Sequence, residues 1–182
     1  NKICLMKCIT LCIFVSLCTI FFSCKEATHS TKEMPNSSME NAALKLEALC
    51  MNSQDSSVTF SMKTKSEDFI CNYDYKYLGL LQVNSNRFEV LQKTVLSGQN
   101  KDALRASVSI RLFLNGKLYG EYNGLNNYYS IKVSSNTIRI YNSETKISNQ
   151  FEIKDSIPQI LFFPYNSKDS SSTGDLFYFN RY

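Results

Sequence analysis

The spacing of hydrophobic residues predicts one helix near the start of the folded part of this chain. From residue 39 to residue 50, apolar side chains recur at intervals of three and four positions, which is typical of an amphipathic helix of about 12 residues. Ser37 and Glu40 have the spacing of a capping box at its start. We expect the apolar face to pack on the rest of the domain, and it consists of Met39, Ala42, Ala43, Leu46, Leu49 and Cys50.

Beyond residue 58 the apolar spacing changes to two, which predicts β-strands with one buried face. The most regular alternations are Val58, Phe60 and Met62, followed by Phe69, Cys71, Tyr73, Tyr75 and Tyr77. Many short apolar runs with a turn about every ten residues predict an all-β, mainly antiparallel fold. We therefore expect a β-sandwich or a barrel-like sheet with one short N-terminal helix.

Two hairpins are predicted from their turn residues. Asn115-Gly116 supplies the two positive-φ positions of a type I′ turn. The register that follows places Leu114 opposite Lys117, Phe113 opposite Leu118, Leu112 opposite Tyr119, and Arg111 beside Gly120. A turn at Ser135-Asn136 likewise places Val133 opposite Ile138 and Ile131 opposite Ile140, with Arg139 on the other side.

The first residues of the chain have the pattern of a secretory signal peptide. Lys2 and Lys7 precede a nearly uncharged apolar run over residues 8–23. A helix over this run would span about 24 Å, less than the roughly 30 Å of a membrane's hydrocarbon core, so a cleaved signal fits better than a transmembrane helix. Cys24 follows this run directly. The alternative to a processing site before Cys24 is that Cys24 is simply one more cysteine of a cysteine-rich leader.

The sequence Phe21-Phe22-Ser23-Cys24 resembles the lipobox of bacterial lipoproteins. It departs from the family pattern, which usually has Leu at the position of Phe21 and a small residue at the position of Phe22. The resemblance implies that Cys24 is diacylated and becomes the mature N-terminus. It divides the chain into a signal peptide (1–23), a flexible tether rich in Ser, Thr, Lys and Glu (24–38) and a single β-rich domain (39–182).

The resemblance also implies a cell-envelope location. The use of Asn, Lys, Ile and Tyr is typical of an AT-rich bacterial genome, and Lys25-Glu26 resembles part of the surface-export signal of some Gram-negative lipoproteins. We expect a lipid-anchored outer-membrane protein that faces the periplasm or the surface. Asp155-Ser156-Ile157 resembles an O-glycosylation sequon of similar envelope proteins, which implies a modification at Ser156.

Charge and cysteine content narrow the set of partners and cofactors. The net charge of +4 falls to +2 (18 − 16) when Lys2 and Lys7 leave with the leader, which gives no argument for nucleic acid. We expect the membrane, through the lipid, and another envelope protein as partners. Cys50 and Cys71 are either one disulfide or two buried thiols. No metal site and no cofactor are expected, because the chain has no CxxC and its one histidine, His29, lies in the tether.

The absence of histidine from residues 39–182 removes the usual general base of serine and cysteine nucleophiles. No catalytic residue is therefore assigned. A glycan hydrolase that uses two carboxylates stays open as an alternative, with Glu67, Asp68, Asp74, Glu121 and Asp155 as candidates.

Tyr128 and Tyr129 lie in a segment rich in Asn and Gly, and we expect this pair to be exposed and available to a partner. The sequence favours a non-enzymatic envelope lipoprotein that acts as a binding or assembly module. The alternatives are the carboxylate-dependent glycan hydrolase and a membrane-tethered inhibitor or immunity protein.

Overall fold

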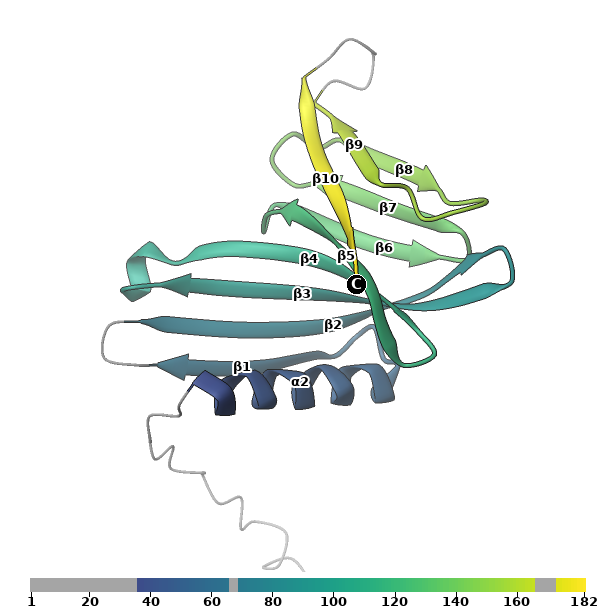
Figure 1. The fold of residues 1–182 in the computed structure, drawn as a ribbon. Coiled ribbons are helices and arrows are strands. Elements are labelled where there is room, and N and C mark those ends of the chain that lie inside the picture. The colour runs from purple at the N-terminus through teal and green to yellow at the C-terminus, as the bar shows by residue number, and fades with distance from the viewer. Residues whose placement is uncertain (1–35, 66–68, 166–172) are drawn as a thin grey trace, which may run out of the picture. The chain divides into compact units, whose positions relative to one another are not determined.

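One helix and ten strands make up the part of the chain that the structure, a computed structural model, describes (Figure 1). This part covers residues 36–65, 69–165 and 173–182, with side chains described from residue 39. The elements are α2 (Asn36–Ser53), β1 (Thr59–Lys65), β2 (Ile70–Val83), β3 (Asn86–Gly98), the 3₁₀ turn η1 (Lys101–Ala103), β4 (Arg105–Leu114), β5 (Lys117–Leu125), β6 (Tyr129–Ser134), β7 (Thr137–Asn142), β8 (Ser148–Glu152), β9 (Ile160–Pro164) and β10 (Gly174–Arg181).

The strands form two antiparallel sheets. The larger has the order β1-β2-β3-β4-β5-β10-β9, and the smaller has the order β6-β7-β8. The sheets are stacked like a sandwich and do not close into a barrel. The predicted fold class, mainly antiparallel β with one helix, is confirmed.

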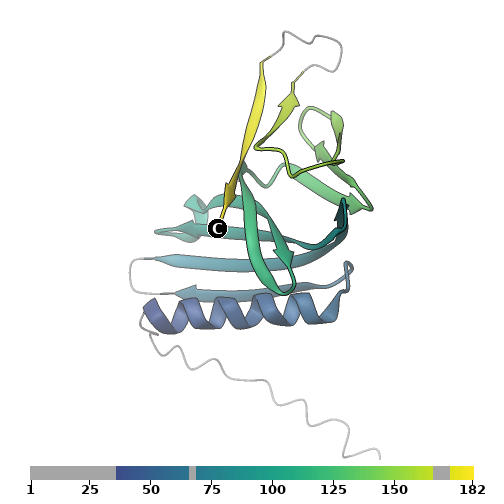
Figure 2. The same ribbon diagram turned by 45° about the vertical axis from the view of Figure 1, so that its right-hand side comes forward.

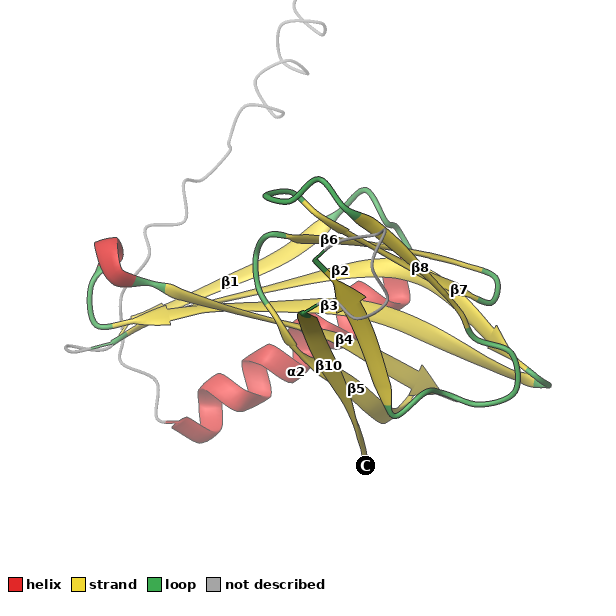
Figure 3. Ribbon diagram, turned by 90° about the horizontal axis from the view of Figure 1, so that it is seen from above, coloured by secondary structure: helices red, strands yellow, loops and turns green. Residues whose placement is uncertain are grey.

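The large sheet is covered on different faces at its two ends. In Figure 1, α2 lies at the bottom beside β1, and the small sheet lies at the top near β9 and β10. Helix α2 contacts β1, β2 and β3, and it crosses behind these strands in Figure 3. Figure 2 shows the same arrangement from a second direction.

Two hydrophobic cores result. The main core lies between the two sheets and contains Val90, Ile110, Tyr122, Ile138, Ile140, Phe163 and Phe177 among others. The second lies under α2 and contains Cys50, Tyr75, Tyr77, Leu91 and Phe113. All described elements belong to one compact unit, so the fragment 33–182 retains both cores.

A bulge lets strand β2 contribute to both cores. The pairing of β2 with β3 shifts between Tyr77 and Gly79. Before the shift, Tyr75 and Tyr77 face α2. Beyond it, Leu81 and Val83 pack into the main core. Gly79 fits the bulge because its φ is +131°, a conformation that other residues rarely adopt.

The predicted β4–β5 hairpin is confirmed at its turn, where Asn115 and Gly116 have φ values of 53° and 73°. Leu114 pairs with Lys117 and Phe113 with Leu118, as expected. Further from the turn the predicted register is wrong by one residue: Leu112 pairs with Gly120, and Arg111 pairs with Glu121. A bulge between Leu112 and Phe113 causes the difference, because it leaves Tyr119 as the extra residue of β5.

The second predicted hairpin, at Ser135-Asn136, is confirmed with its register. Val133 pairs with Ile138 and Ile131 with Ile140, while the neighbouring Arg139 is exposed. These two strands supply most of the small sheet's contribution to the main core.

Helix α2 is longer than predicted and presents a different face to the sheet. Ala43 and Cys50 are buried as expected, but Leu49 is exposed and Glu47 is buried in the helix–sheet interface. Val58 is also exposed and lies just before β1. The burial of a carboxylate in this interface needs a partner charge, which strand β4 provides.

Candidate functional site

A cluster of charged side chains lies between α2 and the large sheet. Arg111 on β4 donates from Nη1 to Oε2 of Glu47 on α2, and Arg111 Nε lies 3.1 Å from Oε2 of Glu121 on β5. The other oxygen of Glu121 accepts a hydrogen bond of 2.8 Å from the Tyr182 hydroxyl. One guanidinium therefore joins the helix to two strands of the sheet.

Burial dominates the electrostatics of this cluster. It raises the pKa of Glu47, although Arg111 and Lys93 on β3 act in the opposite direction. Burial also lowers the pKa of Lys93, and the charge of Arg111 lowers it further. Burial, with the charge of Glu47, raises the pKa of Tyr75 to about 12. The cluster is suited to holding α2 on the sheet, because each carboxylate already engages the guanidinium.

The structure describes three of the five predicted carboxylates, and it does not bring these three together. Glu121 lies in the cluster under α2, whereas Asp74 projects from the opposite face of the sheet. Asp155 is exposed in the loop after β8, where its carbonyl accepts a hydrogen bond of 2.6 Å from Asn84. Glu67 and Asp68 lie outside the described residues. Sequence reasoning missed Glu47, although its position between Ala43 and Cys50 on the apolar side of the helix is a signal for a buried carboxylate.

The prediction of an exposed tyrosine pair is wrong for Tyr129. Its side chain is 4% exposed and makes edge-on contacts with Phe163 and Phe177, each with a ring-centroid distance of 5.3 Å. Its hydroxyl donates to Oδ2 of Asp175. Tyr128 is 42% exposed, as expected. The difference arises because β6 begins at Tyr129, and strand geometry turns its side chain towards the core.

Cys50 and Cys71 are free and buried in the structure. Cys50 packs against Tyr77 of β2, while Cys71 is the second residue of that strand and lies about 20 Å from Tyr77 along it. A disulfide needs Cα atoms within about 7 Å, so this geometry does not allow the bridge. Burial raises the pKa of the Cys50 thiol to about 11.

The predicted modification sites differ in what the structure describes. Ser156 is exposed in the loop between β8 and β9. Cys24, the predicted lipidation site, lies outside the described residues.

A strip of exposed apolar side chains covers the outer face of strands β9 and β10. Ile160, Phe162, Leu176 and Tyr178 are between 39% and 52% exposed. Leu176 pairs with Phe162 and Tyr178 with Ile160, so the four side chains share one face of two adjacent strands. We call these four residues the outer strip.

The outer strip lies on the same face of the sheet as α2, at the end that the helix does not reach. Tyr178 of β10 pairs with Asn123 of β5, and Glu121 of β5 pairs with Arg111 of β4. Because paired residues lie on the same face, this face continues from β10 through β5 to β4. On the opposite face of β1, β2 and β3, with the half-buried Leu96 as an exception, most side chains left to solvent or half-buried are polar: Ser61, Lys63, Asn72, Asp74, Lys76, Gln92 and Thr94. The solvent-facing sheet surface is thus mostly polar there and apolar at the outer strip.

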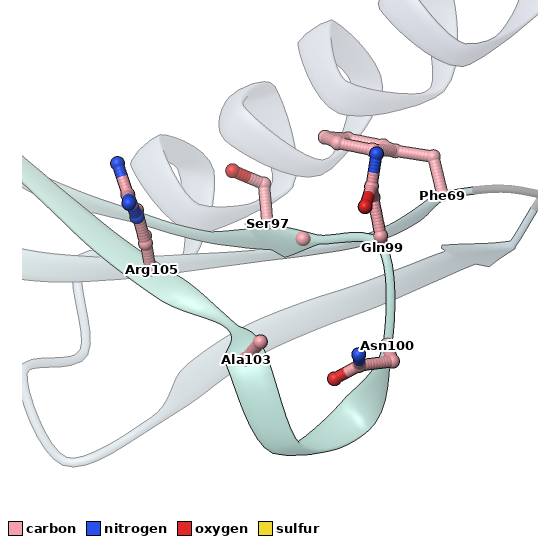
Figure 4. A pocket seen from close by; sticks show the side chains of 7 residues that line it. Phe69, Ser97, Gln99, Asn100, Ala103 and Arg105 are labelled. Carbon is pink, nitrogen blue, oxygen red and sulfur yellow. The ribbon is translucent and has the colours of Figure 1, made fainter.

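A pocket of about 400 Å³ lies beside the turn between β3 and β4. It is lined by Phe69, Ser97, Gly98, Gln99, Asn100, Ala103 and Arg105. Its polar side chains do not converge on a common point (Figure 4), and Asn100 Oδ1 already accepts a hydrogen bond from the backbone of Asp102. We therefore assign no ligand to this pocket.

Among the residues that the structure describes, no three His, Cys, Asp or Glu side chains are grouped to hold a metal ion. The described helices include none with the length and apolar character needed to cross a membrane. Comparison of the chain with protein-family models, with curated proteins and with solved structures gave no match in any of the three.

Proposed function

We propose that this protein is a non-enzymatic binding or assembly module of the cell envelope, and that it contacts its partner through the outer strip. The strip carries the proposal because it is an exposed apolar surface on two paired strands, at the end of the sheet face that α2 does not reach. Contact with a partner removes Ile160, Phe162, Leu176 and Tyr178 from water, which is favourable. Another envelope protein is the partner class that we propose.

The proposed membrane anchor rests on the sequence. A lipobox-like leader that ends at Cys24 and a polar segment over residues 24–38 together suit a domain held near a membrane by lipid. Intact mass measurement of protein purified from its native membrane tests this part. An acylated chain that starts at Cys24 supports it, and an unmodified chain that starts elsewhere contradicts it.

The ion-pair cluster supports a structural role for Glu121. A carboxylate-dependent glycosidase holds two acids about 5 to 9.5 Å apart on either side of a substrate cleft. Glu47 and Glu121 instead share Arg111 beneath α2. Assay of the fragment 33–182 on a panel of glycan and peptidoglycan substrates should give no turnover; turnover that Glu121→Gln abolishes would favour the hydrolase.

Photocross-linking at the outer strip tests the binding proposal directly. We would place a photoreactive residue at position 162 of the full chain in its native membrane, and at position 44 as a control. Leu44 on α2 is 58% exposed, so it matches the strip in exposure without belonging to it. A cross-linked protein specific to position 162 supports the proposal, and equal products at both positions contradict it. A soluble toxin as the cross-linked species would indicate a tethered inhibitor or immunity protein instead.

A further inference from the structure

The outer strip has the chemistry of a surface that binds a copy of itself. We propose that a second copy of this chain occupies it, with the two strips packed face to face about a two-fold axis. This inference rests on the proposed function and names the envelope partner of the same surface. It is drawn from the charge, the area and the backbone geometry of β9 and β10.

The four side chains of the outer strip carry no charge. Strand β9 has the sequence Ile-Leu-Phe-Phe-Pro, and the outward side chains of β10 are Leu176, Tyr178 and Asn180. The one carboxylate of these strands, Asp175, turns to the other face, where it accepts hydrogen bonds from Tyr129 and Tyr165. A two-fold contact sets the same surface on both sides, so an excess of one charge would repel itself, and the four residues of this strip carry none.

The lack of charge on the outer strip also favours a second copy of the chain over an anionic lipid surface as its occupant. Lipid headgroups of that kind are recognised by clustered lysine or arginine side chains. The strip contains none. The neighbouring positions on the same face are the amides Asn123 and Asn180 and the carboxylate of Glu121, which Arg111 and the Tyr182 hydroxyl already engage. Amides donate and accept hydrogen bonds, so they can pair across a symmetric contact.

The available area suits a weak dimer. Tyr182 follows Tyr178 and Asn180 on the same face and is 69% exposed, so it extends the apolar surface. At roughly 150–250 Å² for a large side chain, the strip and Tyr182 together expose roughly 450 Å² in each copy. Two such surfaces with their amide rim reach the roughly 1,000 Å² at which specific interfaces begin. We therefore expect an association that depends on protein concentration.

The face of β9 is more accessible to a partner than its edge. A strand that adds to an edge needs free backbone donors and acceptors. The carbonyl of Phe162 already accepts from Asn149 of β8 at 3.4 Å, and Pro164 has no N–H to donate. Face-to-face packing uses the side chains that the structure leaves in water.

Sedimentation equilibrium of the fragment 33–182, from about 5 μM to about 500 μM, tests the proposal. We expect the dimer fraction to rise over this range. Phe162→Asp and Tyr178→Asp should each weaken association by at least about tenfold, because each would bury a charge in an apolar contact. The control Leu44→Asp should leave the association unchanged, and circular dichroism should confirm that all three variants stay folded.

The outcomes separate this inference from the proposed function. A fragment that is monomeric over the whole range overturns the second copy as partner. If position 162 nevertheless cross-links to a different protein in the membrane, the outer strip remains the binding surface. Equal effects of Phe162→Asp and Leu44→Asp on association contradict the inference as well, because the contact would not be specific to the strip.

Discussion

Arg111 lies directly opposite Glu121 in the β4–β5 pairing, with Arg111 Nε 3.1 Å from Glu121 Oε2. The bulge between Leu112 and Phe113 places Glu121 opposite Arg111. A hairpin without the bulge would place Gly120 opposite Arg111. The same guanidinium reaches Glu47 on α2. A one-residue shift in register thus provides the charge that holds the helix on the sheet.

Replacing Arg111 by Met should destabilise the protein by about 3–5 kcal/mol, because the buried Glu47 and the half-buried Glu121 would lose their shared partner. Glu47→Gln should change stability by less than about 1 kcal/mol at neutral pH, since Arg111 keeps Glu121. Urea unfolding of the fragment 33–182 measures both. Arg105→Met, at an exposed position of the same strand, is the matched control and should change little. A loss for Arg111→Met no larger than that of the control would show that the cluster does not hold the helix.

The raised pKa of Glu47 predicts a specific pH dependence. Burial raises this pKa above its ordinary value of 4.5, so the folded state binds the proton more readily than the unfolded state. Protonation of Glu47 therefore stabilises the folded state. This contribution to the free energy of unfolding is complete below about pH 4.5 and is lost as the pH rises through the raised pKa of Glu47.

The comparison of the wild type with Glu47→Gln isolates this effect from the other groups that face Glu47, which are Lys93, Arg111 and Glu121. The wild type should lose unfolding free energy relative to the variant between pH 4.5 and pH 7. A difference that stays constant, or that grows in the wild type's favour with pH, would contradict the burial of an ionisable Glu47.

Gly116→Val should reduce stability by about 1–3 kcal/mol through backbone strain alone. Gly116 has a φ of +73°, and an added Cβ would have open space around it, so no steric collision contributes. Gly116→Asn should cost less, because Asn adopts positive φ more readily. Thermal unfolding compares the two, and equal melting temperatures for Gly116→Val and the wild type would remove the support for a positive-φ turn.

Tyr129→Ala should destabilise the protein by about 3–5 kcal/mol, because it removes a buried ring from the main core. Tyr128→Ala should change stability by less than about 0.5 kcal/mol, since the Tyr128 side chain is largely in water. Chemical denaturation measures the pair. Similar costs for the two substitutions would mean that adjacent residues do not face opposite sides here.

Local turn chemistry made both hairpins predictable from the sequence. Asn115-Gly116 and Ser135-Asn136 specify tight turns, and the register near each turn follows from chain geometry alone. The bulges could not be predicted in this way. Arg111 contacts Glu47, which is 64 positions away in the chain, so its place in the register depends on tertiary packing.

The outer strip was not predictable from periodicity. Residues 160–163 are Ile, Leu, Phe and Phe, a continuous apolar run that contains no alternation to show which side faces water. Only the packing of Leu161 and Phe163 into the main core turns Ile160 and Phe162 outward. Tyr128 and Tyr129 pose the same problem, because one position in a strand decides between exposure and burial.

Oxidative footprinting of the outer strip in the native membrane tests the central claim most directly. Hydroxyl radicals modify exposed Phe, Tyr and Leu side chains, and mass spectrometry measures the extent at each residue. If the strip is a binding surface, Phe162 and Tyr178 should be protected in the membrane relative to the dilute fragment 33–182, while Leu44 and Tyr128 should be modified equally in both. Equal modification of Phe162 and Tyr178 in the two preparations would contradict the account.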